Sequence, residues 1–336
     1  MKSILGIGNA LTDILAVLPD DTLLKKYNLP LGSMQHVDAK TGNTIWSDLK
    51  EIGVQYVAGG SAANTVSATA ILGMPSGYIG KVGNDELGSL FRQSQLQNGI
   101  KSNLLIGTAA SGRAMVFITA PNADRTFATY LGAALELEPG DLKPEYYEGY
   151  DYLHIEGYLV QNQYLVRRAV EMGREHNMII SLDMASYNVV ESNDAFLHNL
   201  VDKYVDIVFA NESESKAFTK LPPREALEEL SRHCDIAVVK VGKEGSMVQS
   251  GDEYHFIGPW PAKTIDATGA GDTYAAGFLY AHSLGMPLDV CGQVGSIIAA
   301  KVVEVVGTKI DVPRWKAAKE EIRSLIASHG VNVEFV

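Results

Sequence analysis

The chain has 336 residues, of which 46% are hydrophobic and 20% are charged, a balance typical of a globular protein. Its formal net charge of −12 argues against a nucleic-acid backbone or an anionic membrane surface as the main partner, but leaves a small phosphorylated ligand open. Two distant cysteines and eight histidines without an HExxH motif argue against a disulfide framework and a structural zinc. No targeting segment or membrane span is recognisable, so we expect a cytoplasmic protein.

Short apolar runs alternate with helical patterns along the chain. The runs at 3–8, 76–82, 151–156, 177–183, 205–210 and 235–241 predict buried strands. Helical spacing of apolar residues occurs at 88–99, 163–176 and 224–233. This order predicts one α/β domain over residues 1–336, in which helices cover a mostly parallel sheet and ligands bind at the carboxyl ends of the strands.

Two stretches, 16–57 and 111–131, break this alternation. The second has the pattern of a hairpin around Pro121 and Asn122. Together they predict a small separate sheet. Two interpretations of that sheet stay open, namely a flap over the ligand site and ordinary edge structure.

Two familiar nucleotide motifs fail in this sequence. "GIGNAL" after the first strand begins like a dinucleotide fingerprint, but Leu11 occupies the third glycine position. The Gly-Lys pairs at 80–81 and 242–243 lack the first glycine of a P-loop, where the chain has Pro75 and Ala237. A dehydrogenase is therefore disfavoured, and a phosphate would have to bind at another loop.

The stretch "IDATGAGDTYAAGF" (265–278) passes from glycines into an apolar helical pattern. Asp272 near the start of that helix suits the positive end of the helix dipole, so an ordinary helix start is one interpretation. Gly269 and Gly271 favour a second interpretation, in which the free backbone N–H groups of the helix start bind an anion such as a phosphate.

Four motifs, in this order and spacing, resemble the ribokinase-like (PfkB) family of sugar and nucleoside kinases: "GNALTDI" (8–14), "AGGSAANT" (58–65), "NESE" (211–214) and "DATGAGD" (266–272). The likeness covers nearly the whole chain, and "LTDILAVLPDDTLLKKYNL" is similar to the adenosine kinase branch. The resemblance implies a three-layer α/β/α domain with a small β-sheet lid. It also implies an enzyme that uses ATP and Mg²⁺, and it leaves open a monovalent cation and the choice between monomer and homodimer.

The resemblance gives roles to the glycine-rich motif. Asp272 matches the catalytic base, and Gly269, Ala270 and Gly271 match an anion hole for the charge that develops during phosphoryl transfer. The alternative for this cluster is a glycine-rich helix entry without chemistry. Thr268 matches the nucleotide-binding stretch but stands where animal adenosine kinases tend to carry Asn, so the purine contacts stay open.

The first two motifs are implied to bind the acceptor. Asn9 and Asp13 follow the first strand, where the family uses the aspartate to accept hydrogen bonds from paired sugar hydroxyls. A turn or cap role is the alternative for Asp13. Gly59 and Gly60 would let the backbone lie against the sugar, which Asn64 would reach from the first helical turn.

Four further residues have a structural interpretation that stands beside a functional one for the residue or its motif. An N-cap role for Ser61 is compatible with sugar binding by its neighbours. Arg125 matches a lid arginine directed at the transferring phosphate, and its alternative is a solvated hairpin arginine. His154 or Tyr158 would line the acceptor pocket, unless the residue is a packed aromatic.

The nucleotide and metal are implied to bind at two other segments. Asn211 and Glu214 form the NxxE pattern associated with Mg²⁺ and phosphate, with Glu214 acting through metal-bound water. An N-cap followed by first-turn acids is the structural alternative. Gly242 and Gly245 match the ATP loop. Lys240 stands where many relatives have Thr or Ser, and it either belongs to that loop or meets a phosphate directly.

These residues favour an ATP- and Mg²⁺-dependent phosphotransferase that acts on a primary hydroxyl of a nucleoside, with adenosine as the first choice. One rival is a PfkB sugar kinase that acts on a free furanose sugar such as ribose or fructose. A rival of another class is a non-catalytic nucleotide-binding sensor on the same fold, which the intact Asp272 and its glycines disfavour.

Overall fold

The computed structural model describes residues 2–119 and 124–335. Within those residues the larger sheet has nine strands in the spatial order β14-β13-β12-β11-β10-β9-β1-β5-β6. The strands from β12 to β6 are parallel, and β13 and β14 add an antiparallel edge. Their bounds are β1 Ile4–Ile7, β5 Ser76–Val82, β6 Lys101–Ile106, β9 Tyr152–Glu156, β10 Ile179–Asp183, β11 Ile207–Asn211, β12 Ile236–Lys240, β13 Ser246–Ser250 and β14 Glu253–Ile257.

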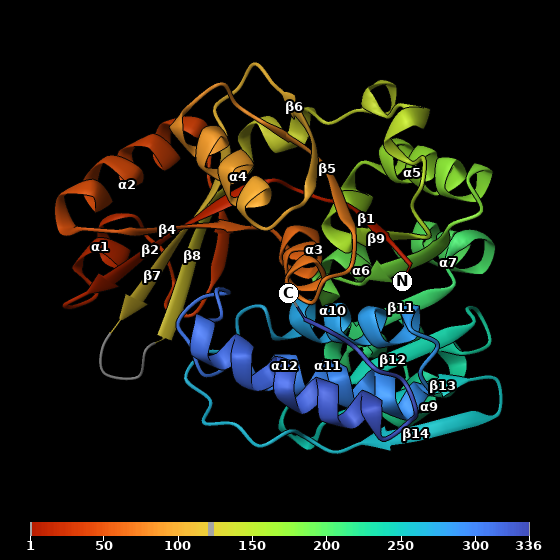
Figure 1. Cartoon of the computed structure of the whole chain (residues 1–336). Coiled ribbons are helices and arrows are strands. Elements are labelled where there is room, and N and C mark those ends of the chain that lie inside the picture. Colours follow the sequence, from red (N-terminus) through yellow and green to blue (C-terminus); the bar gives the residue numbers. More distant parts are fainter. Residues whose placement is uncertain (1, 120–123, 336) are drawn as a thin grey trace.

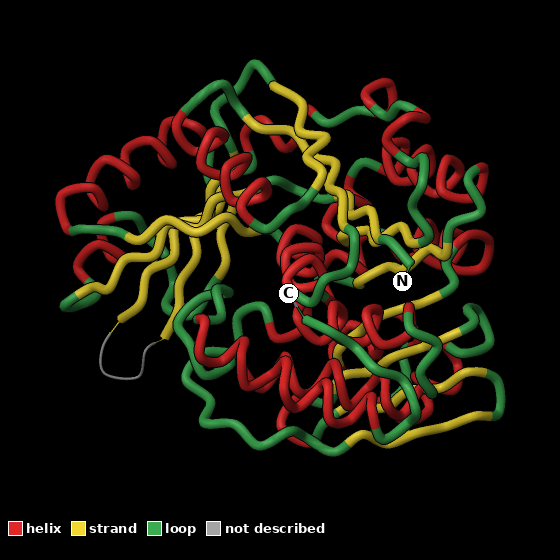
Figure 2. Tube along the Cα trace, in the orientation of Figure 1, coloured by secondary structure: helices red, strands yellow, loops and turns green. Residues whose placement is uncertain are grey.

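Helices cover both faces of the larger sheet and give the domain three layers, as Figure 1 and Figure 2 show. One face carries α3, α10, α11 and α12, and the other carries α5 to α9. The α-helices are α1 Thr22–Lys26, α2 Ala39–Ile52, α3 Ser61–Ile71, α4 Glu86–Gln97, α5 Gln163–Glu175, α6 Tyr187–Ser192, α7 Asp194–Tyr204, α8 Glu212–Thr219, α9 Pro223–Leu230, α10 Ala270–Ser283, α11 Leu288–Val302 and α12 Val312–Ala327. In the described part of the chain, no helix has the length and apolar character needed to cross a bilayer.

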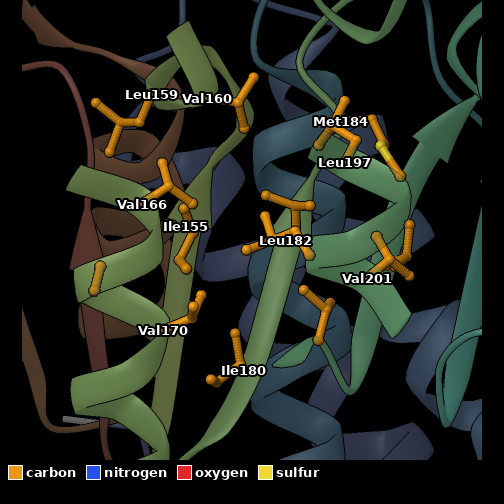
Figure 3. Packing of buried hydrophobic residues seen from close by; sticks show 14 of the residues in the cluster. Ile155, Leu159, Val160, Val166, Val170, Ile180, Leu182, Met184, Leu197 and Val201 are labelled. Atoms are coloured by element: carbon orange, nitrogen blue, oxygen red, sulfur yellow. The ribbon is translucent and has the colours of Figure 1, made fainter. Parts of the chain in front are cut away.

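Alternate residues of the central strands face the two helical layers, because side chains alternate across a strand. On β11, Val208 and Ala210 pack with the helices of one face, and Ile207 and Phe209 pack with those of the other. Figure 3 shows the first layer, where side chains of α5 and α7 pack on β9 and β10. Since both faces are buried, the strands have near-continuous apolar sequences.

The predicted fold class is confirmed. The six apolar runs form β1, β5, β9, β10, β11 and β12, and the three helical patterns form α4, α5 and α9, with ends that differ by no more than three residues. The edge strands β6 and β14 and the neighbouring β13 were not predicted. Edge strands expose one face or one side to water, so β6 and β14 carry mixed polar sequences that do not stand out from loops.

A second, smaller sheet has its five described strands in the order β3-β8-β7-β2-β4. Helices α1 and α2 cover one face through Leu24, Ile45 and Leu49. The other face carries Leu15 and Val116. The strands are β2 Leu11–Leu18, β3 Met34–His36, β4 Gln55–Gly59, β7 Gly112–Thr119 and β8 Asp124–Tyr130.

These strands come from the two irregular stretches, although β2 begins already at Leu11. The chain passes from β1 directly into this sheet and not into a helix, which is why the dinucleotide fingerprint fails there. The predicted turn at Pro121 and Asn122 lies outside the described residues. The lid role of the small sheet stays a prediction.

Candidate active site

One cavity of about 1210 Å³ lies where the carboxyl ends of β9 to β12 face the small sheet and the starts of α3 and α10. Most site residues predicted from the sequence line it. Gly59 and Arg125 only neighbour lining residues, and of the alternative candidates His154 and Tyr158 only Tyr158 is in the lining. The predicted residues in the lining are Asn9, Asp13, Gly60, Asn64, Asn211, Glu214, Lys240, Gly242, Gly245, Thr268, Gly269, Ala270, Gly271 and Asp272. The fold thus brings residues from the segments 9–64 and 211–272 together at one cavity.

Helix α10 begins at the glycine-rich motif on the cavity wall. Gly269 is its N-cap residue and has a φ of 75°, a left-handed conformation that favours glycine. Gly269 has no side chain that could accept from the first-turn N–H groups, and residues 269–271 line the cavity. A helix start of this kind suits an anion. An anion hole at these residues stays a prediction.

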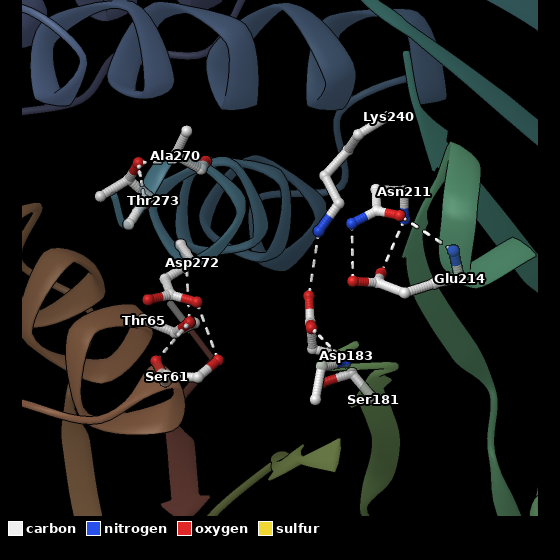
Figure 4. Close-up of polar contacts among 12 residues, drawn as sticks. Ser61, Thr65, Ser181, Asp183, Asn211, Glu214, Lys240, Ala270, Asp272 and Thr273 are labelled. Atoms are coloured by element: carbon white, nitrogen blue, oxygen red, sulfur yellow. Dashed lines mark hydrogen bonds and ion pairs between the residues drawn. The ribbon is translucent and has the colours of Figure 1, made fainter. Parts of the chain in front are cut away.

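Helix α3 holds the carboxylate of Asp272. Ser61 Oγ donates to Oδ1 and Asn64 Nδ2 donates to Oδ2, each at 2.8 Å. Thr65 Oγ1 donates to the Asp272 carbonyl oxygen at 3.1 Å, and Figure 4 shows Ser61 and Thr65 facing Asp272. Burial and the Asp183 charge raise the pKa of Asp272 to about 6, although the bonds from Asn64 and Ser61 oppose this rise.

These contacts change the interpretation of the start of α3. Its N-cap residue is Gly60, so the N-cap role considered for Ser61 is wrong, and the Ser61 hydroxyl is bonded to Asp272 instead. Asn64 is also bonded to Asp272. Its contact with a sugar is still only predicted.

The two glycines before α3 leave room for the first motif. A Cβ on Gly59 would lie 2.6 Å from Asp13 Oδ2, and a Cβ on Gly60 would lie 2.2 Å from the Asn9 carbonyl oxygen. A larger residue at either position would displace these groups. Burial and the charge of Asp272 raise the pKa of Asp13 to about 7.

Glu156, the last residue of β9, was not singled out from the sequence. It is 1% exposed and accepts from Asn9 Nδ2 at 2.7 Å, from the Asn9 N–H at 3.3 Å and from the Ala62 N–H at 3.2 Å. Burial raises its pKa to about 7 against these bonds. The sequence shows that a glutamate ends this apolar run. It does not show that β9 lies beside β1, which is what brings Glu156 to Asn9.

The two aromatic candidates at the end of β9, His154 within the strand and Tyr158 after it, have different surroundings. Tyr158 lines the cavity, and its hydroxyl donates to the Ala185 carbonyl oxygen at 3.5 Å. His154 is fully buried, and its Nδ1 lies 2.9 Å from Ser181 Oγ. Burial lowers the pKa of His154 to about 4. His154 is therefore a packed neutral residue, and Tyr158 is the one at the cavity.

Asn211 and Glu214 form a reciprocal capping box at the start of α8. Asn211 Oδ1 accepts from the Glu214 N–H at 2.9 Å, and Glu214 accepts from the Asn211 N–H at 2.8 Å and from Nδ2 at 2.6 Å. The structural alternative is thus present, and both residues nevertheless line the cavity. Burial and the Asp183 charge raise the pKa of Glu214 to about 7. Over the described residues, no group of three or more His, Cys, Asp or Glu is placed to hold a metal ion.

A buried ion pair joins the ends of β10 and β12, as Figure 4 shows. Lys240 Nζ donates to Asp183 Oδ2 at 3.0 Å, and Asp183 also accepts from the Ala185 N–H at 2.9 Å. Burial opposes ionisation, but Lys240 holds the pKa of Asp183 below its usual value. Asp183 is a second cavity residue that was not identified from the sequence, where it is only the polar end of a predicted strand.

Gly242 and Gly245 lie in the turn between β12 and β13 and have positive φ angles of 56° and 113°. A Cβ on Gly245 would lie 2.0 Å from the Ile257 carbonyl oxygen, so the turn needs glycine to pack on the sheet edge. Both glycines line the cavity. Their contact with ATP is untested.

Arg125, on β8, reaches from the small sheet to the glycine-rich motif. Its guanidinium pairs with Asp266 Oδ2 at 2.6 Å and donates to Thr268 Oγ1 at 3.2 Å. The Arg125 side chain is only 11% exposed, so the interpretation as a solvated hairpin arginine is wrong. Asp266 also accepts from the N–H groups of Thr268 and Gly307. Contact of Arg125 with a phosphate stays a prediction.

A doubly covered parallel sheet whose strand ends share one cavity with a glycine-rich helix start is the architecture of a ribokinase-like kinase. A model of the pfkB family of carbohydrate kinases matches residues 27–315, and the chain therefore belongs to this family. It is a phosphotransferase with an alcohol group as acceptor.

Its relatives carry different acceptors in their names. The adenosine kinase of Sinorhizobium meliloti is 32% identical, with a TM-score of 0.86 and coverage of 95% of this chain and 99% of that one. A probable sugar kinase of Rhizobium etli is 28% identical, with a TM-score of 0.86 and coverage of 96% and 99%. The 5-dehydro-2-deoxygluconokinase of Geobacillus thermodenitrificans is 30% identical over 74% of this chain and 79% of that protein. The kinase class is common to them, and the acceptor is not.

The raised carboxyl pKa values predict an unusual pH dependence of stability. Asp13 and Glu156 have folded pKa values of about 7, above those of an unfolded chain, so the folded state binds protons that the unfolded state has released. The stability contributed by these bound protons is therefore lost as the pH rises, and the free energy of unfolding should fall between about pH 5 and pH 8. Urea denaturation at a series of pH values measures this slope.

Asp13→Asn should make that slope shallower, because it removes one of the groups. The matched control is Asp38→Asn. Thr41 bonds hold the pKa of Asp38 below its usual value, so its stabilising effect is lost only in acid and the slope above pH 5 should not change. A rise in stability over this window in the unmodified protein would contradict the prediction.

Proposed function

We propose that this kinase transfers the γ-phosphoryl group of ATP to a primary hydroxyl of a nucleoside, with adenosine as the acceptor. The main support is the cavity wall on the side of Asp13, where the small sheet and the turn after it contribute apolar side chains. They are Leu11, Met34, Phe127, Leu131 and Leu135. A purine would cover these side chains, whereas a free sugar would leave them in contact with water. The similarity to the Sinorhizobium adenosine kinase adds support.

Asp272 is the proposed general base. Its pKa of about 6 leaves it mostly ionised at neutral pH and still basic enough to accept the proton of the acceptor hydroxyl. Each of its oxygens accepts only one bond from α3, so lone pairs remain for that hydroxyl. The backbone N–H groups of residues 269–271 would stabilise the charge on the transferred group.

The acceptor is assigned to the first two motifs. Asp13 would accept hydrogen bonds from the 2′- and 3′-hydroxyls, which two oxygens of one carboxylate can do together. Asn9, held by Glu156, would donate to the same sugar. The space at Gly60 and the neighbouring Asn64 would complete the sugar site.

The other end of the cavity suits ATP and Mg²⁺. Gly242, Gly245 and Thr268 are the proposed nucleotide contacts. Glu214, 4% exposed, and Asn211 supply the hard oxygen atoms that Mg²⁺ prefers, and we assign Glu214 to the metal through bound water. When bound, Mg²⁺ would neutralise charge on the ATP phosphates.

The small sheet is the proposed lid. Arg125 links it to the glycine-rich motif through Asp266 and Thr268, so the sheet and the proposed anion hole meet at one contact. A guanidinium beside this motif could also contact a transferred phosphoryl group. A kinase benefits from such a cover, because water reaching the activated phosphate would hydrolyse it.

A sugar acceptor is the second candidate, and the 30% identity to a 5-dehydro-2-deoxygluconokinase favours it. A sensor without catalysis is disfavoured, because Asp272 and its glycine neighbours are in place at the cavity. An assay that couples ADP release to each acceptor separates these candidates.

Asp272→Asn tests the base. Loss of proton acceptance should lower kcat by about 10²–10⁴-fold while folding and ATP binding are kept. The control is Asp289→Asn, which changes the first-turn acid of α11 outside the cavity and should leave turnover unchanged. Near-normal turnover of Asp272→Asn would rule out this mechanism.

Adenosine and 2′-deoxyadenosine test the acceptor. If Asp13 binds both hydroxyls, the deoxy compound should have a lower kcat/KM. The loss should correspond to roughly 1.5–3 kcal/mol of transition-state binding free energy, the scale of one lost charged hydrogen bond. Asp13→Ala should remove most of this difference. Equal rates on both nucleosides, or turnover only with ribose, fructose or 5-dehydro-2-deoxygluconate, would refute adenosine and leave the kinase class intact.

Hydrogen exchange tests the lid. Peptides from 16–57, 111–119 and 124–131 should gain protection together when an acceptor and an ATP analogue are added. Arg125→Ala should lower kcat more than it weakens acceptor binding, whereas Lys40→Ala on the exposed surface of α2 should change neither. Protection confined to 269–272 would show that these segments are ordinary edge structure.

A further inference from the structure

The ion pair between Lys240 and Asp183 does more than join two neighbouring strands. Lys240 ends β12 and Asp183 ends β10, and β11 lies between them, so the pair passes over the end of the middle strand. The Lys240 side chain is 16% exposed and that of Asp183 is 9% exposed. Both line the cavity. A lysine is thus held at the strand ends with its ammonium inside the site.

The same ammonium also stands against the start of α10. A Cβ built on Gly271 would lie 2.9 Å from Lys240 Nζ, so the lysine comes this close only because residue 271 is glycine. Figure 4 shows the Lys240 side chain pointing toward Asp183 on one side of α10, with Ala270 and Asp272 on the other side in this view. The Lys240 charge is therefore placed beside the proposed anion hole.

Lys240 is a buried cation surrounded mainly by carboxylates. Asp183, Glu214 and Asp272 lie close enough to affect its charge, and together with burial, which opposes them, they leave the pKa of Lys240 above its usual value. Over the described residues, the lysines and arginines in the lining are Lys240 and the exposed Lys243. A triphosphate that enters this carboxylate-rich site would meet Lys240 as the buried cation of the cavity lining, with Arg125 beside the lining at Thr268.

We propose that Lys240 is a catalytic residue that binds the phosphoryl group in transfer, and that Asp183 is a positioning residue that holds the ammonium until nucleotide arrives. This inference rests on the proposed function. In the step, the acceptor oxygen forms a bond to the γ-phosphorus, the bond from that phosphorus to the β–γ bridging oxygen breaks, and ADP leaves. The hydroxyl proton passes to Asp272, and Lys240 keeps its proton and stabilises the oxygens of the moving group.

The opposing explanation is a purely structural ion pair. Removing one partner of a buried pair destabilises a protein, because a lone charge remains, whereas neutral replacement of both partners is often tolerated. A structural pair should therefore recover activity in the double variant. A phosphate-binding lysine should not, because the double variant still lacks the cation.

The experiment compares Lys240→Met, the double variant Asp183→Asn/Lys240→Met, and Lys216→Met as a control. Lys216 is exposed on α8 outside the cavity. Asn at position 183 can still accept from the Ala185 N–H. Calorimetry measures the affinities for ADP and for the β,γ-imido analogue of ATP, urea denaturation measures stability, and coupled assays measure kcat.

We expect both variants that lack Lys240 to lose roughly 10- to 100-fold of the preference for the γ-phosphate-bearing analogue over ADP, with ADP affinity kept. With an acceptor that the unmodified protein phosphorylates, both variants should also have a lower kcat. The double variant should show this loss even though its stability is restored. The control should match the unmodified protein.

Full recovery of the preference in the double variant, or its retention in Lys240→Met, would overturn the proposal. Should Lys240→Met fail to fold, the double variant decides alone. Because the affinities are measured without an acceptor, they test Lys240 even if every nucleoside and sugar fails as a substrate. Absence of any turnover by the unmodified protein would count against the proposed function and not against the binding result.

Discussion

The site depends on the contact between the first turn of α10 and the first turn of α3. Asp272 accepts from Ser61, which is 211 residues away in sequence, and from Asn64 one helical turn later. Through this contact the glycine-rich helix start and the segment after β4 face the same cavity. The close approaches at Gly59 and Gly60 then bring Asp13 and the end of β1 to that cavity. A single carboxylate thus orders both the proposed phosphate end and the proposed sugar end.

The price of this arrangement is electrostatic. Among the described residues, five buried carboxyl groups gather at the cavity, and burial acts to raise the pKa of each: Asp13, Glu156, Asp183, Glu214 and Asp272. Only Asp183, with Lys240 as its direct partner, keeps a pKa below its usual value. Such a concentration of perturbed groups is costly to a fold and typical of a catalytic site. Cations that enter with the substrates would relieve the repulsion.

Several residues in the site make a structural contact and also have a proposed functional role. Asn211 and Glu214 cap α8 while facing the cavity, and Arg125 joins the small sheet to the segment before α10 while lying beside the glycine-rich motif. A helix-capping role therefore does not exclude a residue from binding substrate or metal. The wall proposed to face the acceptor comes mainly from the small sheet, whereas the proposed base comes from α10, which packs on the larger sheet. This division fits a family whose members share the kinase class and differ in the acceptors they are named for.

The sequence by itself determined the fold class, the central strands and the glycine-rich and polar motifs that line the cavity. Strands buried on both faces leave continuous apolar runs, and glycines at close backbone approaches leave clustered motifs, so both features are local and readable. Only the tertiary structure decided that Glu156 holds Asn9, that Asp183 holds Lys240, and that Ser61 bonds to Asp272 and does not cap α3. These partners follow from the order of strands in the sheet and from the docking of α10 on α3. Local periodicity does not encode either, because both depend on contacts between residues far apart in the chain.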